Sequence, residues 1–177
     1  MKNVTKILTA AVLCAAVFAS TERTDALGGN PAFWPGDEAN IAAFPAQINN
    51  HGFVQVTDAN TATAGVDMVF SAGGNNWGLG FSDDDDTWFD LGWGNGGMGI
   101  NIAMLNSDDG AGDEVSGYAL SYGNSFDWGE LGFHYNSGDE VTEGIELDFR
   151  KSCGFWVFTD MVANLDAPDD SDMTLDV

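Results

Sequence analysis

Basic residues are scarce in this chain. Its 177 residues include five Lys and Arg against 28 Asp and Glu, so the formal net charge is −23. A protein that binds nucleic acid needs positive charge to neutralise phosphates, and we therefore expect no nucleic-acid partner. The charge does not imply disorder, because 44% of the residues are hydrophobic and 12% are aromatic. That is enough apolar surface for one folded domain.

The N-terminal apolar run is too short for a membrane helix. Residues 7–19 give 13 apolar or small residues, whereas a transmembrane helix needs about 20. The run follows Lys2 and Lys6, and small residues mark cleavage sites after Ala19 and Ala26. This arrangement is typical of a secretory signal peptide. We predict that residues 1–26 direct export and are removed.

Cysteine and histidine are also few, with two of each. Cys14 lies in the predicted signal peptide, so the exported chain keeps only Cys153 and can form no intrachain disulfide. With His51 and His134 as the only histidines, a Cys/His metal site is not expected. Stability must then come from a sheet, a membrane or a bound metal.

From Gly52 onward, large apolar residues alternate with small or polar residues. The clearest case is 145–150, where apolar and charged side chains alternate, and similar alternation occurs at 77–81, 89–93, 98–104, 117–122 and 130–135. Because successive strand residues point to opposite faces, the pattern predicts nine complete strands and the start of a tenth at Met173. Residues 155–163 are predicted as a strand that is apolar on both faces. Several strands, especially 77–82, look short for a membrane.

The predicted turns are of two kinds that alternate along the chain. Residues 73–76, 94–97, 123–127 and 151–154 are short and hold one acid, Asp127, whereas 82–87, 106–114, 136–140 and 164–172 hold 14 acids. In an up-and-down meander, alternate turns lie at opposite ends of the sheet. One neutral rim and one long, acidic rim are typical of a transmembrane barrel, with the acidic loops outside the cell. A soluble sandwich has no reason for this polarity.

We therefore predict an all-β, antiparallel up-and-down transmembrane β-barrel, or part of one, over residues 52–177. Only five residues follow Asp172, so we expect the N-terminal portion of a longer barrel. Polar residues that alternate with the lipid-side residues are predicted to face the lumen: Asp90, Asn101, Glu130, His134, Glu146, Asp148 and Arg150. A net-negative lumen favours cations, although the many small residues on that face also leave room for a plug.

The segment before the first strand is predicted to be a plug or a capping helix over residues 27–51. Asp37 and Glu38 suit the first turn of a short helix, and Pro45 would end it. Residues 27–29 (Leu-Gly-Gly) and 37–46 (Asp-Glu-Ala-Asn-Ile-Ala-Ala-Phe-Pro-Ala) resemble the opening of the fatty-acid-transporter-like outer-membrane barrels. That family has Asn-Pro-Ala where this chain has Phe44-Pro45-Ala46. The resemblance implies a plugged barrel that passes hydrophobic compounds.

Two chemical hypotheses concern the loops and the single strand histidine. Asp108, Asp109 and Asp113 lie in an oxygen-rich, glycine-containing loop that could bind calcium weakly, although a solvated acidic loop has the same composition. No other cofactor is expected. His134 lies near Glu146 and Asp148, but there is no G-x-S-x-G motif to fix a nucleophile. We expect no enzymatic activity.

The sequence predicts a general class of function and no particular substrate. The chain is expected in the outer membrane of a Gram-negative cell, in contact with lipid. It would pass small or hydrophobic molecules, or serve as a structural membrane protein that displays acidic extracellular loops. The alternative is a secreted, soluble β-sandwich that binds calcium or carbohydrate through its acidic loops. In a barrel the Leu, Phe, Trp and Tyr faces contact lipid, whereas in a sandwich they form a dry core between two sheets.

Overall fold

The computed structural model describes residues 32, 34, 36–57, 65–84, 87–108, 114–138, 143–155, 158–169 and 172–176. The predicted signal peptide, residues 1–26, and the Leu-Gly-Gly sequence at 27–29 lie outside the described residues.

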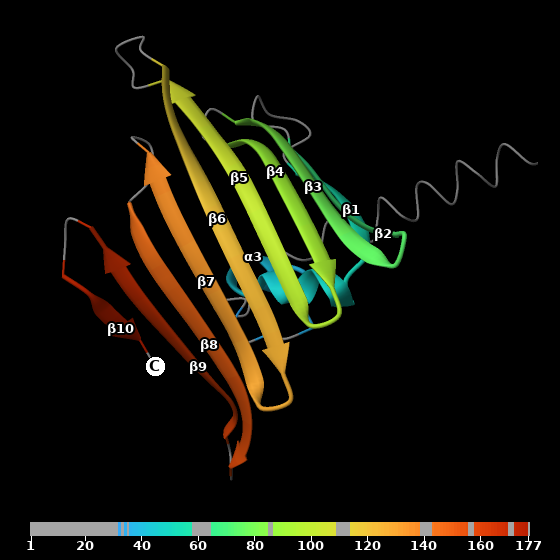
Figure 1. The fold of residues 1–177 in the computed structure, drawn as a ribbon, viewed down its shortest axis with the longest axis vertical. Helices are drawn as coiled ribbons and strands as arrows, with labels where there is room; N and C mark the ends of the chain where they lie inside the picture. Colours follow the sequence, from blue (N-terminus) through green and yellow to red (C-terminus); the bar gives the residue numbers. More distant parts are fainter. Residues whose placement is uncertain are drawn as a thin grey trace, which may run out of the picture.

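Ten antiparallel strands form one sheet in which each strand pairs with its neighbours in the chain (Figure 1). They are β1 (Phe53–Thr57), β2 (Gly65–Ala72), β3 (Asn75–Asp84), β4 (Thr87–Asn95), β5 (Met98–Asp108), β6 (Glu114–Phe126), β7 (Gly129–Gly138), β8 (Gly144–Phe155), β9 (Phe158–Pro168) and β10 (Thr174–Asp176). The all-β meander and its strand count are confirmed. The sheet is open, with β1 and β10 as its two edges.

Most strands are longer than the sequence predicted. The run at 77–82 belongs to β3, which has 10 residues, and β6 has 13. The predicted loop boundaries at Asn106 and Asn164 are wrong, because both residues are paired within strands, with Ser116 and Asp148. The predicted strand at 155–163 is present but begins later, since β8 ends at Phe155 and β9 runs from Phe158 to Pro168. Backbone pairing continues through polar residues, which carry no apolar alternation to reveal it.

Short turns join the strands at one end of the sheet, at residues 73–74, 96–97 and 127–128. Gly73, Gly74 and Gly96 have φ of 64°, 79° and 62°, a conformation that glycine adopts without steric cost. Because consecutive strands are antiparallel, the strand ends that flank the acidic connections lie at the opposite end of the sheet. Parts of the predicted acidic loops lie in strands, and others, including Asp109 and Asp113, lie outside the described residues.

A short helical segment lies against one face of the sheet (Figure 1). It consists of α3 (Asn40–Ala43) and the 3-10 helix η2 (Pro45–Asn50), and η2 contacts β3, β4, β5 and β6. Asp37 and Glu38 precede α3 instead of forming its first turn, and Pro45 begins η2. Proline is well tolerated at a first helical position, because its missing N–H has no intrahelical partner there. We call the covered face the inner face and the opposite one the outer face.

The two faces differ sharply in chemistry. Across β2 to β7, one register row of the outer face consists of Met68, Leu79, Leu91, Ile102, Leu120 and Tyr135. Across β3 to β9, one row of the inner face consists of Gly78, Gly92, Asn101, Ser121, His134, Glu146 and Asp166. The predicted alternation of apolar with small or polar side chains is therefore realised over most of the sheet.

The buried residues lie mainly where the helical segment meets the inner face. The buried hydrophobic residues among those described are Ala32, Phe44, Ala46, Ile48, Val69 and Val162. An equal number of polar or charged residues is buried, namely Asp37, Asn40, Gln47, His134, Asp148 and Arg150. This interior is much more polar than the core of an ordinary soluble domain.

Candidate functional site

A row of glycines lets the helical segment lie directly on the sheet. Neighbouring strands from β4 to β7 place four glycines in register: Gly94, Gly99, Gly123 and Gly132. A Cβ atom on Gly99 would stand 2.0 Å from the Pro45 carbonyl oxygen, and one on Gly132 would stand 2.0 Å from the Ala43 carbonyl oxygen. No side chain fits at these two positions. The small residues noted in the sequence therefore form the seat of the helical segment.

Arg150 on β8 ties the N-terminal residues to the sheet. The side chain is 3% exposed and forms an ion pair with Glu130 of β7, with Nε 2.8 Å from Oε2. The guanidinium also donates to Asn40 Oδ1 and to the Ala32 carbonyl, the latter at 2.8 Å. Its Cζ lies 4.3 Å from the centroid of the Phe44 ring. The charge is thus compensated by a carboxylate, two neutral acceptors and an aromatic face.

Glu130 extends this network to η2 and β6. Its Oε1 accepts hydrogen bonds from Gln47 Nε2 and from Ser125 Oγ, the latter at 3.1 Å. Asn49 of η2 reaches the next hairpin, where its Nδ2 donates to the Met98 carbonyl at 2.8 Å. Side chains of the helical segment therefore hold strands that are far apart in sequence.

His134 on β7 lies at the centre of a second polar cluster. Its Nδ1 is 2.8 Å from Ser121 Oγ, and its Nε2 is 3.1 Å from the Ala43 carbonyl oxygen and 3.2 Å from Asp148 Oδ2. Both neighbours of Nε2 are acceptors, so this nitrogen carries a hydrogen. Asn164 of β9 donates to Asp148 Oδ1 at 3.0 Å and to Glu146.

This second cluster contains the residue types of a Ser-His-Asp hydrolase, but its surroundings are those of a packed contact. The Ala43 carbonyl oxygen and Asp148 both contact Nε2, whereas Ser121 contacts Nδ1, so α3 packs against the acid side of the imidazole. A triad is defined by geometry around a bound substrate. Neither of the two cavities described below is lined by Ser121 or His134.

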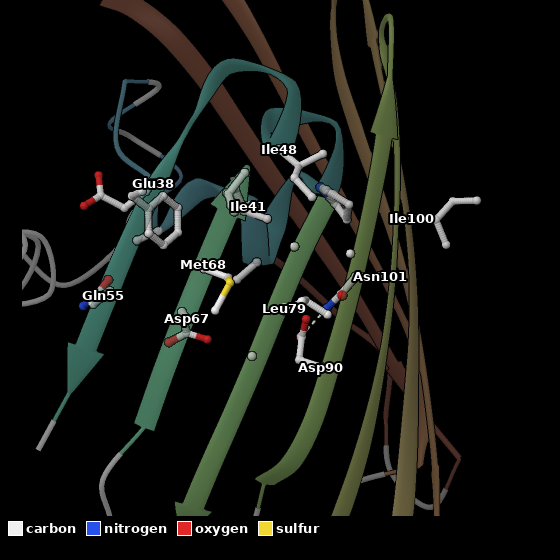
Figure 2. Close-up of a pocket in the computed structure, with 18 residues that line it drawn as sticks. Glu38, Ile41, Ile48, Gln55, Asp67, Met68, Leu79, Asp90, Ile100 and Asn101 are labelled. Carbon is white, nitrogen blue, oxygen red and sulfur yellow. Dashed lines mark hydrogen bonds between the residues drawn. The ribbon is translucent and has the colours of Figure 1, made fainter. Parts of the chain in front are cut away.

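A cavity of about 340 Å³ lies between the helical segment and β1 to β5 (Figure 2). Ile41 and Ile48 border it from the segment, Glu38 borders it from the turn before α3, and Asp67 and Asp90 border it from the sheet. Asn101 Nδ2 donates to Asp90 Oδ2 at 2.7 Å, while the buried Asn101 Oδ1 has no hydrogen-bond partner among the described residues. A second cavity of about 330 Å³ lies at the short-turn end, beside Trp128 and Arg150.

All seven residues predicted to face a lumen lie in the inner-face rows. The structure groups them as Asp90 with Asn101, Glu130 with Arg150, and His134 with Glu146 and Asp148. Sequence reasoning missed several partners of these groups: Asn40, Gln47, Asp67, Ser121 and Asn164. Asp67 could have been found, because it alternates with Val66 and Met68 in the β2 sequence.

The predicted calcium ligands are described only in part. Asp108 is the last residue of β5 and pairs with Glu114, whereas Asp109 and Asp113 lie outside the described residues. Within the described ranges, no group of three His, Cys, Asp or Glu side chains is arranged to hold a metal ion.

One carboxylate in a connection at the acidic end has a shifted pKa. Glu143 Oε1 accepts hydrogen bonds from Ser137 Oγ at 2.8 Å and from the Gly138 N–H at 3.1 Å. These two donors stabilise the ionised form and lower the pKa of Glu143 below its ordinary value. The contact links the end of β7 to the start of β8.

Comparisons with protein-family models, curated proteins and solved structures found no match to this chain. The resemblance of residues 27–29 and 37–46 to the fatty-acid-transporter-like barrels therefore stays a prediction. Among the described residues, no helix has the length and apolar character needed to cross a membrane.

Proposed function

We propose that this chain is an outer-membrane protein whose outer face contacts lipid and whose inner face is polar and plugged by its N-terminal segment. The observation that carries the proposal is the exposure of apolar residues across the outer face. They include Val54, Phe70, Phe81, Met98, Ile100, Ile102, Met104, Tyr118, Leu120, Tyr122, Phe126, Trp128, Leu131, Ile145, Leu147 and Met161. Soluble monomers rarely expose a continuous apolar surface of this extent.

The strand lengths agree with this proposal. The eight strands from β2 to β9 have 8 to 13 residues, and a tilted transmembrane strand needs about 9–11. β1 and β10 are shorter, with five and three residues. Further strands that pair with these edges would complete the lipid-facing wall, because unpaired backbone groups are costly in a bilayer.

Aromatic residues on the outer face flank a central aliphatic row. Leu79, Leu91, Ile102 and Leu120 are in register across β3 to β6. Toward the short turns the next row contains Trp77, Trp93, Ile100, Tyr122 and Phe133, and toward the acidic end it contains Phe81, Phe89, Met104 and Tyr118. The two aromatic-containing rows lie four residues apart along each strand, or about 13 Å. They therefore lie within an apolar band of about 25 Å, as a membrane barrel has, and do not mark its two interfaces.

The position of the helical segment favours a plugged passage over an open pore. Its contacts extend from Gly78 on β3 to Arg150 on β8, so it covers the middle of the polar face near the short-turn end. In the proposed orientation this end lies in the periplasm and the acidic connections lie outside the cell. Passage of a small molecule then requires displacement of the segment or movement around it.

Cell fractionation of the signal-bearing protein tests the proposal. We expect recovery in the outer membrane, a boiling-dependent shift in gel mobility, and quenching of Trp fluorescence by lipids brominated on their acyl chains. Quenching is expected because Trp77, Trp93 and Trp128 belong to the outer face. Soluble protein in the periplasm or medium, unaffected by brominated lipid, would contradict the proposal and favour the secreted sandwich. The described strands form one sheet. A sandwich would therefore need a second sheet that these strands do not supply.

A further inference from the structure

The cavity between the helical segment and β1 to β5 exists because the sheet lacks side chains there. Gly78, Gly80 and Gly92 of β3 and β4 line it. The Ile48 side chain closes one end, since its Cδ1 would stand 3.2 Å from a Cβ on Gly78 and 2.8 Å from one on Gly92. Gly80 is left uncovered by this side chain and forms the floor of an open space.

Two carboxyl groups border the space above Gly80. Asp67 on β2 and Asp90 on β4 are the register partners of Gly80 on its two sides. A Cβ on Gly80 would lie 2.8 Å from Asp67 Oδ1 and 3.6 Å from Asp90 Cγ. Both carboxyl groups therefore approach one point in the cavity. Like charges held this close repel each other, and a cation between them removes that repulsion.

The rest of the lining gives the site its selectivity. Glu38, which precedes α3, also borders the cavity, but its carboxylate points away from Asp67 and Asp90 (Figure 2). No Lys, Arg or His occurs among the described residues that line the cavity. Ile41, Ile48, Phe53 and Val69 supply apolar walls. An anion would meet carboxylates without a compensating charge, whereas a ligand with a positive end and an apolar body would satisfy both parts of the lining.

The unpartnered Asn101 Oδ1 is a second, independent sign of a ligand. Asn101 lines the cavity and already donates to Asp90, yet its carbonyl oxygen is buried and accepts no hydrogen bond within the described ranges. Buried acceptors are usually satisfied in folded proteins. An ammonium group held by Asp90 would bring N–H donors to the neighbourhood of this oxygen. A metal ion fits less well, because no set of three ligating side chains is present in the described part of the chain.

We propose that this cavity binds a small organic cation, an amine or ammonium group carried on a short apolar body. The ammonium end lies between Asp67 and Asp90 over Gly80, and the apolar body lies against Ile41 and Ile48. The inference rests on the proposed function for the ligand's further passage across the membrane, but binding itself can be measured separately.

The test uses three six-carbon probes whose head groups are positive, neutral and negative: hexylammonium, hexanol and hexanoate. Each is titrated calorimetrically into the full chain in non-ionic detergent, with a protein-free micelle blank. We expect hexylammonium to bind at least tenfold more tightly than either of the others. Equal binding of all three, tighter binding of hexanoate, or no binding of hexylammonium would overturn the proposal. So would binding of calcium alone.

Variants locate the binding within the molecule. Asp67→Asn and Asp90→Asn should each weaken hexylammonium binding about tenfold, since each removes a charge-assisted hydrogen bond. Gly80→Ala should weaken it by filling the floor. Asp166→Asn is the matched control, because Asp166 lies on the inner face of β9, outside the residues that line the cavity. An equal loss in Asp166→Asn would show a general effect of net charge and contradict the assignment.

The result is separable from the membrane proposal. If fractionation finds soluble protein, the same titration can be run in buffer, and selective hexylammonium binding would still support the cavity. If the protein is in the membrane but discriminates none of the probes, only the ligand assignment fails.

Discussion

Arg150 is the residue through which the sheet and the N-terminal segment depend on each other most directly. Its guanidinium is buried, and its partners come from β7, from α3 and from the residues before α3. A buried ion pair adds little net stability over an apolar replacement of both partners, but loss of one partner leaves an uncompensated charge. The pair therefore fixes the position of the segment more than it stabilises the fold.

Replacement of one partner should be far more damaging than replacement of both. We expect Glu130→Gln to destabilise the protein by about 3 kcal/mol, because it leaves the buried positive charge of Arg150 without a compensating carboxylate. The double variant Glu130→Gln with Arg150→Met should recover part of this loss. Midpoints of boiling-dependent gel mobility or of denaturant unfolding measure the effect, with Asp166→Asn as the control. A double variant less stable than Glu130→Gln alone would contradict this reasoning.

The Glu143 carboxylate gives a local dependence on pH. Its pKa is lower in the folded protein than in the unfolded chain, so its contacts stabilise the fold above the unfolded pKa. That contribution is lost as the pH falls through the folded pKa. Ser137→Ala removes one donor and should raise the pKa of Glu143 toward its ordinary value. A carboxyl titration followed by NMR checks this, and an unchanged pKa would show that the Gly138 N–H suffices.

At the scale of elements, the helical segment packs closely on the sheet because the strand residues beneath it are glycines without side chains. The segment backbone lies against Gly99, Gly123 and Gly132, where any Cβ would overlap it. The alternation of large and small residues was enough to predict the number of strands and their faces. It could not predict where strands end, because Asn106 and Asn164 continue the ladder without an apolar signal.

A methyl group in the glycine row should displace the segment and leave the sheet paired. We expect Gly99→Ala to cost about 1–3 kcal/mol by overpacking and to make residues 40–50 accessible to protease. The circular dichroism of the strands should be unchanged. Gly52→Ala is the control, since its nearest contact would be an ordinary 3.8 Å. Equal protection of the segment in both variants would mean that it is not seated on the glycines.

At the scale of the whole molecule, apolar side chains are exposed on the outer face and polar side chains are buried on the inner face, which is the reverse of a soluble domain. The sequence allowed this reversal to be predicted, because apolar and charged residues alternate strictly over residues 145–150 of β8. It did not allow the inner-face clusters to be predicted. Arg150 meets a residue of α3 that is 110 positions away, and no local pattern encodes that pairing. The register and the placement of the helical segment together bring these side chains into contact.

Adjacent residues on opposite faces offer a test of this reversal. Leu120 belongs to the outer face, and Ala119 of the same strand belongs to an inner row with Ala103 and Asn136. In a bilayer, Leu120→Arg should destabilise by about 2–4 kcal/mol, as expected for Arg facing lipid near the midplane. Ala119→Arg should cost far less. Unfolding from liposomes in denaturant measures both, and equal effects would argue against a lipid-facing outer surface.

The seat of the helical segment also sets an order of events during folding. The segment is synthesised before any strand, yet its binding surface consists of residues from β3 to β8 and is complete only when β8 has joined the sheet. Contacts between residues so distant in sequence form slowly, because a long loop must be closed first. The helical segment must therefore stay undocked until most of the sheet has formed, and its docking is a late step in folding.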